Sequence, residues 1–245
     1  MAEGGGFNFS QFIDDSKNTL TNPKEYFASM AKEGGFGEPI IKALLYGLVA
    51  GIITFIWGFA GLSAAGGLGA MFGGAVGIMA IVGSLIFALI GLFIGGLIML
   101  IISAICGGNT SYEANVRVTA SLMVMSPIQA LLGFTGGINF YLGAIVGLAV
   151  SLYGLWLLYN ALTASLAAKE GASKVVTIVL AVLVVLMTIT SFTAYRAASS
   201  LGDKYQKDAE KMMQDAQDAM KGNEEGMKAL EQLKKAAEEM EKQNQ

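Results

Sequence analysis

Hydrophobic residues fill three long blocks of this chain that contain no charged residue. The blocks run over 43–112, 118–168 and 175–195. A membrane-spanning helix needs about 20 apolar residues to cross about 30 Å of hydrocarbon. Because lipid offers the backbone no hydrogen-bond partners, such segments cross the membrane as helices. The pattern therefore predicts an all-α fold, a polytopic transmembrane helix bundle.

The blocks have room for about five spans. We place these at about 38–62, 79–104, 118–134, 141–166 and 175–194. Pro127 lies inside the third span, where it removes a backbone hydrogen bond and is expected to kink or break the helix. The glycine-rich segment 63–78 fits a loop or short hairpin best, but a re-entrant segment or a further short span also fits its composition.

The N-terminal segment 1–38 contains two clusters of aromatic residues, around Phe12 and Phe27, with charged residues between them. Each cluster predicts a short amphipathic helix. Such helices either lie along the lipid headgroups or cap the end of their own bundle, and we favour the cap. The predicted organisation is therefore an amphipathic cytoplasmic segment at 1–38, a five-span domain at 39–195 and a separate tail.

The tail, 196–245, is strongly charged and contains no proline. This composition predicts a soluble helix, or a helical hairpin that bends at the glycines of 222–226. A heptad pattern of alanine, leucine and methionine predicts weak coiled-coil association, and a solvated helix is the alternative. The larger side chains assigned to this oligomerisation seam are Met212, Leu230, Leu233 and Met240.

The composition argues against several classes of function. The net charge is only −3, and the basic residues form no stripe that would follow a nucleic acid backbone. The chain has no histidine and one cysteine, Cys106, so the commonest metal ligand and proton shuttle is missing. No nucleophile, base and orienting group occur together. We therefore expect no enzymatic activity, no metal and no cofactor.

Lysine and arginine predict which side of the membrane the N-terminus occupies. Cytoplasmic segments carry an excess of these residues close to the spans. With five spans and a cytoplasmic N-terminus, the two outer loops carry none, and the inner segments carry Lys17, Lys24, Lys32, Lys42, Arg117, Lys169 and Lys174. The tail would then be exported with its own lysines, and a sixth span within 63–78 would reverse this.

Small and polar residues within the spans suggest further roles. Glycines four residues apart let helix backbones approach closely in lipid, and here they favour packing inside the bundle over dimerisation. These pairs are Gly47 with Gly51, Gly91 with Gly95, and Gly143 with Gly147. Gln129, Asn160 and Thr163 are candidates for lining a water path, although a hydrogen bond to a neighbouring helix is the simpler interpretation for each.

Glu113 and Arg117 stand four residues apart just before the third span. On a helix they share one face. We interpret them as a surface ion pair, which typically contributes a few tenths of a kcal/mol. The alternative is a docking point or an anchor that fixes the start of the span.

Three groups of residues resemble the Ypt-interacting protein (Yip) domain family. The first is the segment 22–27 followed by Pro39, and the second is the segment 111–121 followed by Pro127. The third group is Trp156, Tyr159, Leu162, Gly171 and Lys174. The motif positions that we carry over are Pro23, Pro39, Tyr112, Glu113, Arg117 and Pro127.

This resemblance implies five spans and a cytoplasmic N-terminus. Eukaryotic members of the family are implicated in vesicle trafficking and bind small Rab-type GTPases, whereas bacterial members mostly have no assigned role. The long charged tail departs from the family pattern. The resulting hypothesis is a non-enzymatic protein of a bacterial inner membrane, a homo-oligomeric scaffold that organises lipid or a protein partner. The alternatives are an oligomeric channel or passive transporter and, third, lipid handling.

Overall fold

The computed structural model describes residues 8–62, 73–221, 226–232 and 235, and within these residues every regular element is a helix. Five helical segments are long and apolar enough to cross a membrane. They are Gly37–Phe59, Ile81–Ile105, Tyr112–Ile138, Phe140–Ser165 and Glu170–Leu201. The predicted all-α bundle with five spans is therefore confirmed. The chain divides into two compact units, Met1–Ile189 and Thr190–Gln245.

Two short helices precede the first span. Helix α1 (Phe9–Thr21) begins after Asn8, whose side chain accepts a hydrogen bond from the Gln11 backbone amide at 3.1 Å. Helix α2 (Pro23–Ser29) has Pro23 at its first position, where a missing N–H costs nothing. Phe27 is fully buried, and α2 packs on the end of the fourth span. The helices therefore pack on their own bundle, as the cap interpretation expects.

The first two spans, α3 (Gly37–Phe59) and α5 (Gly73–Ile105), pack closely along their length. The hydroxyl of Ser84 in α5 donates to the carbonyl of Gly47 in α3 at 3.0 Å. Such an approach of hydroxyl to backbone requires a residue without a side chain. The sequence of the glycine-rich segment 63–78 leaves open a loop, a re-entrant segment or a further span. Most of it, residues 63–72, lies outside the described residues.

The third span is interrupted, as the position of Pro127 predicts. It consists of α6 (Tyr112–Leu122), α7 (Met125–Leu132) and α8 (Phe134–Ile138). The break falls at residues 123–124, because the proline ring clashes with the carbonyl of residue i−4 and cannot donate to it. Among the helices whose burial the structure describes, α6 is the most enclosed, with seven of its eleven residues buried.

The fourth span is α9 (Phe140–Asn160), which continues into a π-helical turn, η1 (Ala161–Ser165). A short turn then leads into α10 (Glu170–Lys221). That turn is joined to the α5–α6 turn by two backbone hydrogen bonds, Asn109 N to Leu166 O at 2.7 Å and Lys169 N to Cys106 O at 2.9 Å. This junction connects the ends of four spans.

Helix α10 runs without interruption from the fifth span into the tail, so no break marks the expected boundary at 195–196. In the second unit, the Met212 side chain is exposed and Leu230 is half-buried. Leu233 and Met240 lie outside the described residues. An exposed ion pair joins Glu231 and Lys235, 3.4 Å apart. The tail's proposed oligomerisation seam stays a prediction.

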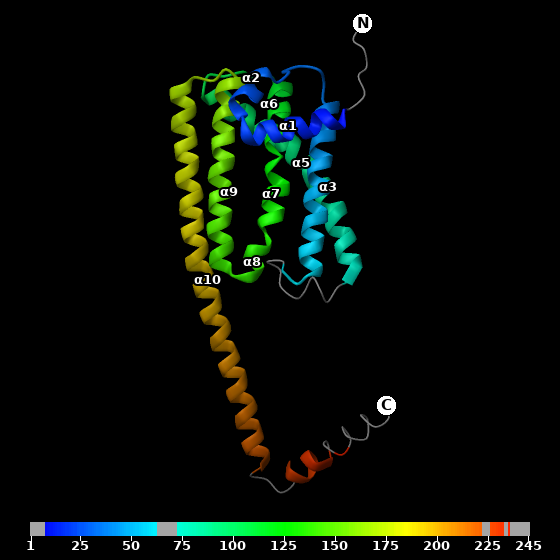
Figure 1. The fold of residues 1–245 in the computed structure, drawn as a ribbon. Coiled ribbons are helices and arrows are strands. Elements are labelled where there is room, and N and C mark those ends of the chain that lie inside the picture. The colour runs from blue at the N-terminus through cyan, green and yellow to red at the C-terminus, as the bar shows by residue number, and fades with distance from the viewer. Residues whose placement is uncertain (1–7, 63–72, 222–225, 233–234, 236–245) are drawn as a thin grey trace. The chain divides into compact units, whose positions relative to one another are not determined.

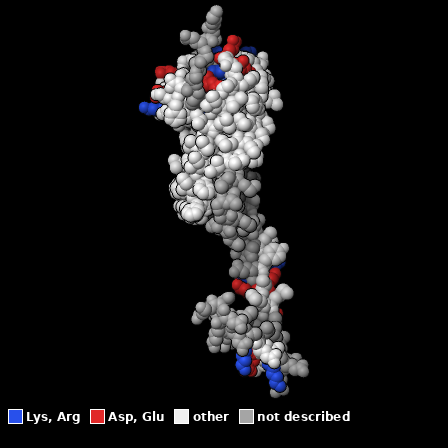
Figure 2. Space-filling view, turned by 90° about the vertical axis from the view of Figure 1, so that its right-hand side faces the viewer, with Lys and Arg blue, Asp and Glu red and all other residues white. Residues whose placement is uncertain are grey.

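We call one end of the bundle the polar end; it comprises α1, α2, the first turns of α3 and α6, η1 and the start of α10. Figure 1 shows α1 crossing the bundle near this end. On the face shown in Figure 2, charged atoms gather there, while the described atoms of the bundle's body are uncharged. The charged side chains of the bundle on this face therefore lie at the polar end.

Candidate functional site

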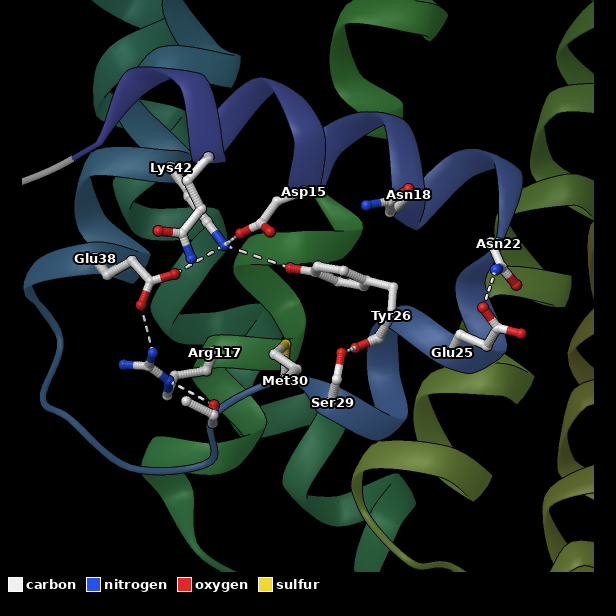
Figure 3. A pocket seen from close by; sticks show the side chains of 12 residues that line it. Asp15, Asn18, Asn22, Glu25, Tyr26, Ser29, Met30, Glu38, Lys42 and Arg117 are labelled. Carbon is white, nitrogen blue, oxygen red and sulfur yellow. Dashed lines mark hydrogen bonds and ion pairs between the residues drawn. The ribbon is translucent and has the colours of Figure 1, made fainter.

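Four charged side chains meet at the polar end, and we call them the ion cluster: Asp15, Glu38, Lys42 and Arg117. The Lys42 ammonium donates to Asp15 Oδ2 and to Glu38 Oε1, each at 2.8 Å. The second oxygen of Glu38 accepts a hydrogen bond from Arg117 Nη2. The Glu38 carboxylate therefore bridges the two cations (Figure 3).

The two cations of this cluster are almost completely enclosed. The side chains of Lys42 and Arg117 are 5% and 7% exposed, whereas that of Glu38 is 42% exposed. A buried charge is tolerated only when it is paired and hydrogen-bonded. Arg117 meets this requirement with two further bonds, from Nε to Ala31 O at 2.8 Å and from Nη1 to Gly35 O at 3.0 Å. It thereby fixes the loop between α2 and α3.

Two tyrosine hydroxyls extend the network into the core. The Tyr26 hydroxyl is 2.8 Å from Ser121 Oγ and accepts a longer bond from Lys42 at 3.4 Å. The Tyr46 hydroxyl lies 2.7 Å from Ser16 Oγ. These contacts connect α2 to α6 and α1 to α3. The polar end is thus held by polar bonds between elements that are far apart in the sequence.

The surface ion pair expected between Glu113 and Arg117 is not the arrangement in the structure. Glu113 Oε1 accepts a hydrogen bond from the Gly35 backbone amide at 2.6 Å, and Arg117 binds Gly35 from its carbonyl side. Both side chains therefore form hydrogen bonds to the backbone of the α2–α3 loop. The physical reason is that fixed backbone groups and the Glu38 carboxylate satisfy a buried guanidinium better than one solvated carboxylate does.

No pattern in the sequence marks Asp15 or Glu38 as site residues. Tyr26 stands out only as part of the Yip-like segment 22–27, and Lys42 only as an orientation signal. One signal was available, because Glu38 and Lys42 stand four apart at the start of a span, where they share a helix face. A lysine inside a span also requires a partner. Asp15 joins the ion cluster, and Tyr26 contacts it, only through tertiary packing.

An open pocket of about 550 Å³ lies against the ion cluster (Figure 3). Its lining comes from α1, α2, the following loop, α3 and α6. The lining residues are Gln11, Asp15, Asn18, Asn22, Glu25, Tyr26, Ser29, Met30, Ala31, Glu38, Lys42 and Arg117. The three residues from α1, Gln11, Asp15 and Asn18, are spaced by four and three positions, which places them on one face of that helix.

The pocket offers more hydrogen-bond acceptors than free cations. Asp15 and Glu38 already neutralise Lys42 and Arg117. Glu25, on the exposed rim, accepts a bond from the Asn22 side-chain amide. The remaining rim groups are amides and a hydroxyl. The pocket is therefore suited to a ligand that brings hydrogen-bond donors or a positive charge.

Comparison with known protein families identifies the family of this chain. The family model described as Yip1 domain matches residues 17–192. The chain belongs to the Yip1 family. No curated protein and no solved structure matches it. The resemblance noted in the sequence is thus confirmed at the family level. The Yip1 match includes Glu38, Lys42 and Arg117 of the ion cluster and ends within α10.

The Yip motif positions lie mainly at the polar end of this Yip1 domain. Pro23 opens α2, and Pro39 lies fully buried in the first turn of α3. Tyr112 opens α6, and its hydroxyl donates to the Phe93 carbonyl at 3.0 Å. Pro127 lies in α7, away from the others, where it follows the helix break.

The six glycines assigned to helix packing occupy unlike environments. A Cβ atom added at Gly47 would lie 2.7 Å from the Ala88 Cβ atom, and one at Gly95 would lie 2.9 Å from Thr119. Gly51 and Gly143 also lie against neighbouring helices. At Gly91 and Gly147 an added Cβ meets nothing within 4 Å. Their role in packing therefore stays a prediction.

The candidate pore-lining residues bond largely within their own helix. Asn160 Nδ2 donates to the Trp156 carbonyl at 2.8 Å, and Thr163 Oγ1 donates to the Tyr159 carbonyl at 2.9 Å. The Gln129 side chain is exposed on α7. A side chain that satisfies its donor on its own helix can still face a partner or water with its other atoms.

Proposed function

We propose that this Yip1-family protein is a non-enzymatic membrane scaffold, which docks a partner at its polar end and assembles as a homo-oligomer. The observation that carries the proposal is the open pocket beside the buried ion cluster. Because the cluster fixes α1, the α2–α3 loop, α3 and α6 relative to one another, little ordering is left to be done on binding. Preorganisation of this kind favours recognition.

The rim of the pocket defines the chemistry of the partner. Asn18, Asn22, Glu25 and Ser29 are exposed, and they present a carboxylate, amides and a hydroxyl. A lysine or arginine side chain from a protein segment can donate a hydrogen bond to the side-chain oxygen of each of these groups. We therefore propose a partner with a basic segment close to the membrane surface.

A fluorescent oligolysine peptide tests this docking site on the full-length protein in lipid nanodiscs. We expect Glu25→Gln to weaken peptide binding at least threefold. The matched control is Glu231→Gln, which removes the same charge from the exposed tail and should leave binding unchanged. An equal loss in both variants would mean that the peptide responds only to net charge, and this would overturn the docking proposal.

Unequal burial of the spans supports assembly. Of the most apolar stretches, 28%, 22% and 33% of residues are buried in the first three spans, but only 6% and 0% in the fourth and fifth. Helices α9 and α10 therefore retain broad apolar faces for lipid or for another copy. We propose that a second copy covers part of them, with the coiled-coil tail adding to the association.

Cysteine cross-linking in native membranes tests the assembly. Val182→Cys and Leu186→Cys on α10 should form disulfide-linked oligomers in a Cys106→Ala background. Phe87→Cys on α5, which is even more exposed, is the matched control and should not do so. Equal cross-linking at all three positions would indicate random collision. Deletion of 203–245 should reduce the oligomer size in detergent without preventing insertion.

A channel is the second candidate, and the interrupted third span favours it. Broken helices at membrane depth line cavities in many transporters, and the exposed polar side chain of Gln129 lies within this broken span. Recordings from purified protein in planar bilayers separate the two functions. Reproducible unitary currents that disappear in Gln129→Leu would replace the scaffold with an oligomeric channel.

We further propose a bacterial inner membrane with the polar end, and hence the N-terminus, in the cytoplasm. The basic residues assigned to inner segments come from elements of the polar end, as the positive-inside rule requires. A membrane-impermeant thiol reagent should label Ser200→Cys but not Ser10→Cys in intact cells lacking Cys106. The opposite pattern would invert the orientation.

A further inference from the structure

Helix α1 packs beside the first span rather than beyond its end. The rings of Phe12 and Tyr46 lie 5.0 Å apart, and Ser16 binds the Tyr46 hydroxyl. Tyr46 comes nine residues after Gly37, the first residue of the span. At about 1.5 Å per residue, this contact lies about 14 Å along the helix from that end. Helix α1 therefore reaches the level of the membrane.

A second contact gives a similar depth at the other end of α1. The Tyr153 hydroxyl donates to the Leu20 carbonyl. Tyr153 comes twelve residues before Ser165, where the fourth span ends at the polar end. In the first span the charged residues end at Lys42, which binds Asp15 of α1 and lies four residues, or about 6 Å, before Tyr46. The uncharged part of the span, which fits the hydrocarbon, begins at the next residue, Ala43. Helix α1 thus crosses the bundle close to the boundary between headgroups and acyl chains.

The two free edges of α1 differ in polarity. Phe9 and Ile13, four residues apart, are 60% and 49% exposed and form an apolar edge. Asn18 lines the pocket and lies nine residues from Phe9, which is half a turn around the helix at about 100° per residue. Between these edges, Phe12 and Thr19 are buried against the bundle.

The position of the pocket decides which edge points toward the membrane. Glu38, in the first turn of α3, lines the pocket together with Asn18. The polar edge of α1 therefore faces the polar end, and the apolar edge faces the middle of the membrane. This is the orientation of an amphipathic helix in the interfacial plane of a bilayer.

We infer that Phe9 and Ile13 insert into the lipid at the boundary between headgroups and acyl chains, and that the pocket consequently opens into the headgroup layer. The occupant of the apolar edge is lipid. The α1 charges are Asp14, Asp15 and Lys17, a net negative set. Apolar burial therefore drives the contact, and anionic lipid does not strengthen it.

Fluorescent labelling of single cysteines tests the inference. An environment-sensitive fluorophore is attached to Phe9→Cys or Ile13→Cys of the full-length protein, lacking Cys106, in phosphatidylcholine vesicles. We expect quenching by lipid carrying a nitroxide at the start of its acyl chain, and little quenching by aqueous iodide. A label at Asn18→Cys is the matched control and should give the opposite pattern. Replacing one third of the lipid with phosphatidylglycerol should change neither result.

Three outcomes would overturn the inference. Equal access of iodide to the Phe9 and Asn18 labels would place α1 in water. Protection of the Phe9 and Ile13 labels from both quenchers would mean that protein, such as a second copy, covers the edge. Stronger lipid quenching with phosphatidylglycerol would mean that electrostatic attraction brings α1 to the surface. Because Phe9 and Ile13 are exposed, their replacement should leave the fold intact, and an unchanged melting temperature of each variant checks this.

Discussion

The polar end and α10 are stabilised in contrasting ways. In α6, at the polar end, seven of eleven residues are buried and Arg117 makes three bonds to other elements. In the most apolar stretch of α10 no residue is buried. An apolar side chain has no driving force to leave lipid, whereas a buried charge must find partners. The polar end therefore determines how the helices are placed, and α10 needs only to be long and apolar.

The largest contrast should appear when equal side chains are truncated in the two regions. Leu162→Ala removes a fully buried side chain beneath α2, and we expect a loss of about 2–5 kcal/mol in unfolding free energy from the cavity left behind. The Leu183 side chain on α10 is already exposed. Leu183→Ala therefore leaves no cavity and should cost less than about 1 kcal/mol. Denaturation in detergent micelles measures the unfolding free energy of both variants. Equal losses would contradict the claim that the polar end and α10 are stabilised differently.

Removing the guanidinium of Arg117 should have the next largest effect. Arg117→Ala leaves Glu38 and two loop carbonyls without their donor, and we expect a loss of about 2–4 kcal/mol, moderated because Glu38 is partly exposed. Arg117→Lys should recover only part of this, since an ammonium cannot reproduce the fork of donors. Lys207→Ala in the exposed tail is the control. An unchanged melting temperature for Arg117→Ala would show that the ion cluster is dispensable.

Two glycines test whether small residues are needed for packing or merely frequent. Gly47→Ala places its Cβ against Ala88, and we expect a loss of about 1–3 kcal/mol from overpacking. Gly91→Ala meets open space and should be neutral or stabilising, because alanine favours helix by about 1 kcal/mol over glycine. Thermal denaturation measures the melting temperature of both variants. An equal decrease in the two would contradict the close contact at Gly47 and the open space at Gly91.

The smallest expected effect concerns one hydroxyl. Tyr26→Phe removes the bond to Ser121 and should cost about 1 kcal/mol, the usual net value of a hydrogen bond. Combining it with Ser121→Ala in a double-mutant cycle should show coupling, since both changes remove the same contact. Tyr205→Phe, at an exposed site in α10, is the control. Full additivity would mean that the two groups act independently.

The candidate site was predictable only in fragments. Glu113 and Arg117 stood out because they lie four apart beside an uncharged block, but their true partners come from residues 31–38, about 80 positions earlier. Asp15 had no signal in the sequence that separated it from the other charged residues of segment 1–38. Tyr26 belonged to the Yip-like segment 22–27, but nothing in the sequence indicated its contacts with Lys42 and Ser121. A pairwise contact between distant segments leaves no local periodicity, and spacing rules therefore miss it.

The sequence by itself determined the all-α class, the five spans, and the break that precedes Pro127. These follow from local requirements: the thickness of the hydrocarbon, the saturation of every backbone hydrogen bond, and the missing N–H of proline. Only the tertiary structure decided that Lys42 and Arg117 share Glu38, that Gly47 meets a neighbour while Gly91 does not, and which edge of α1 borders the pocket. Those outcomes depend on how helices distant in the chain are placed side by side, and apolar patterning in lipid carries little information about this placement.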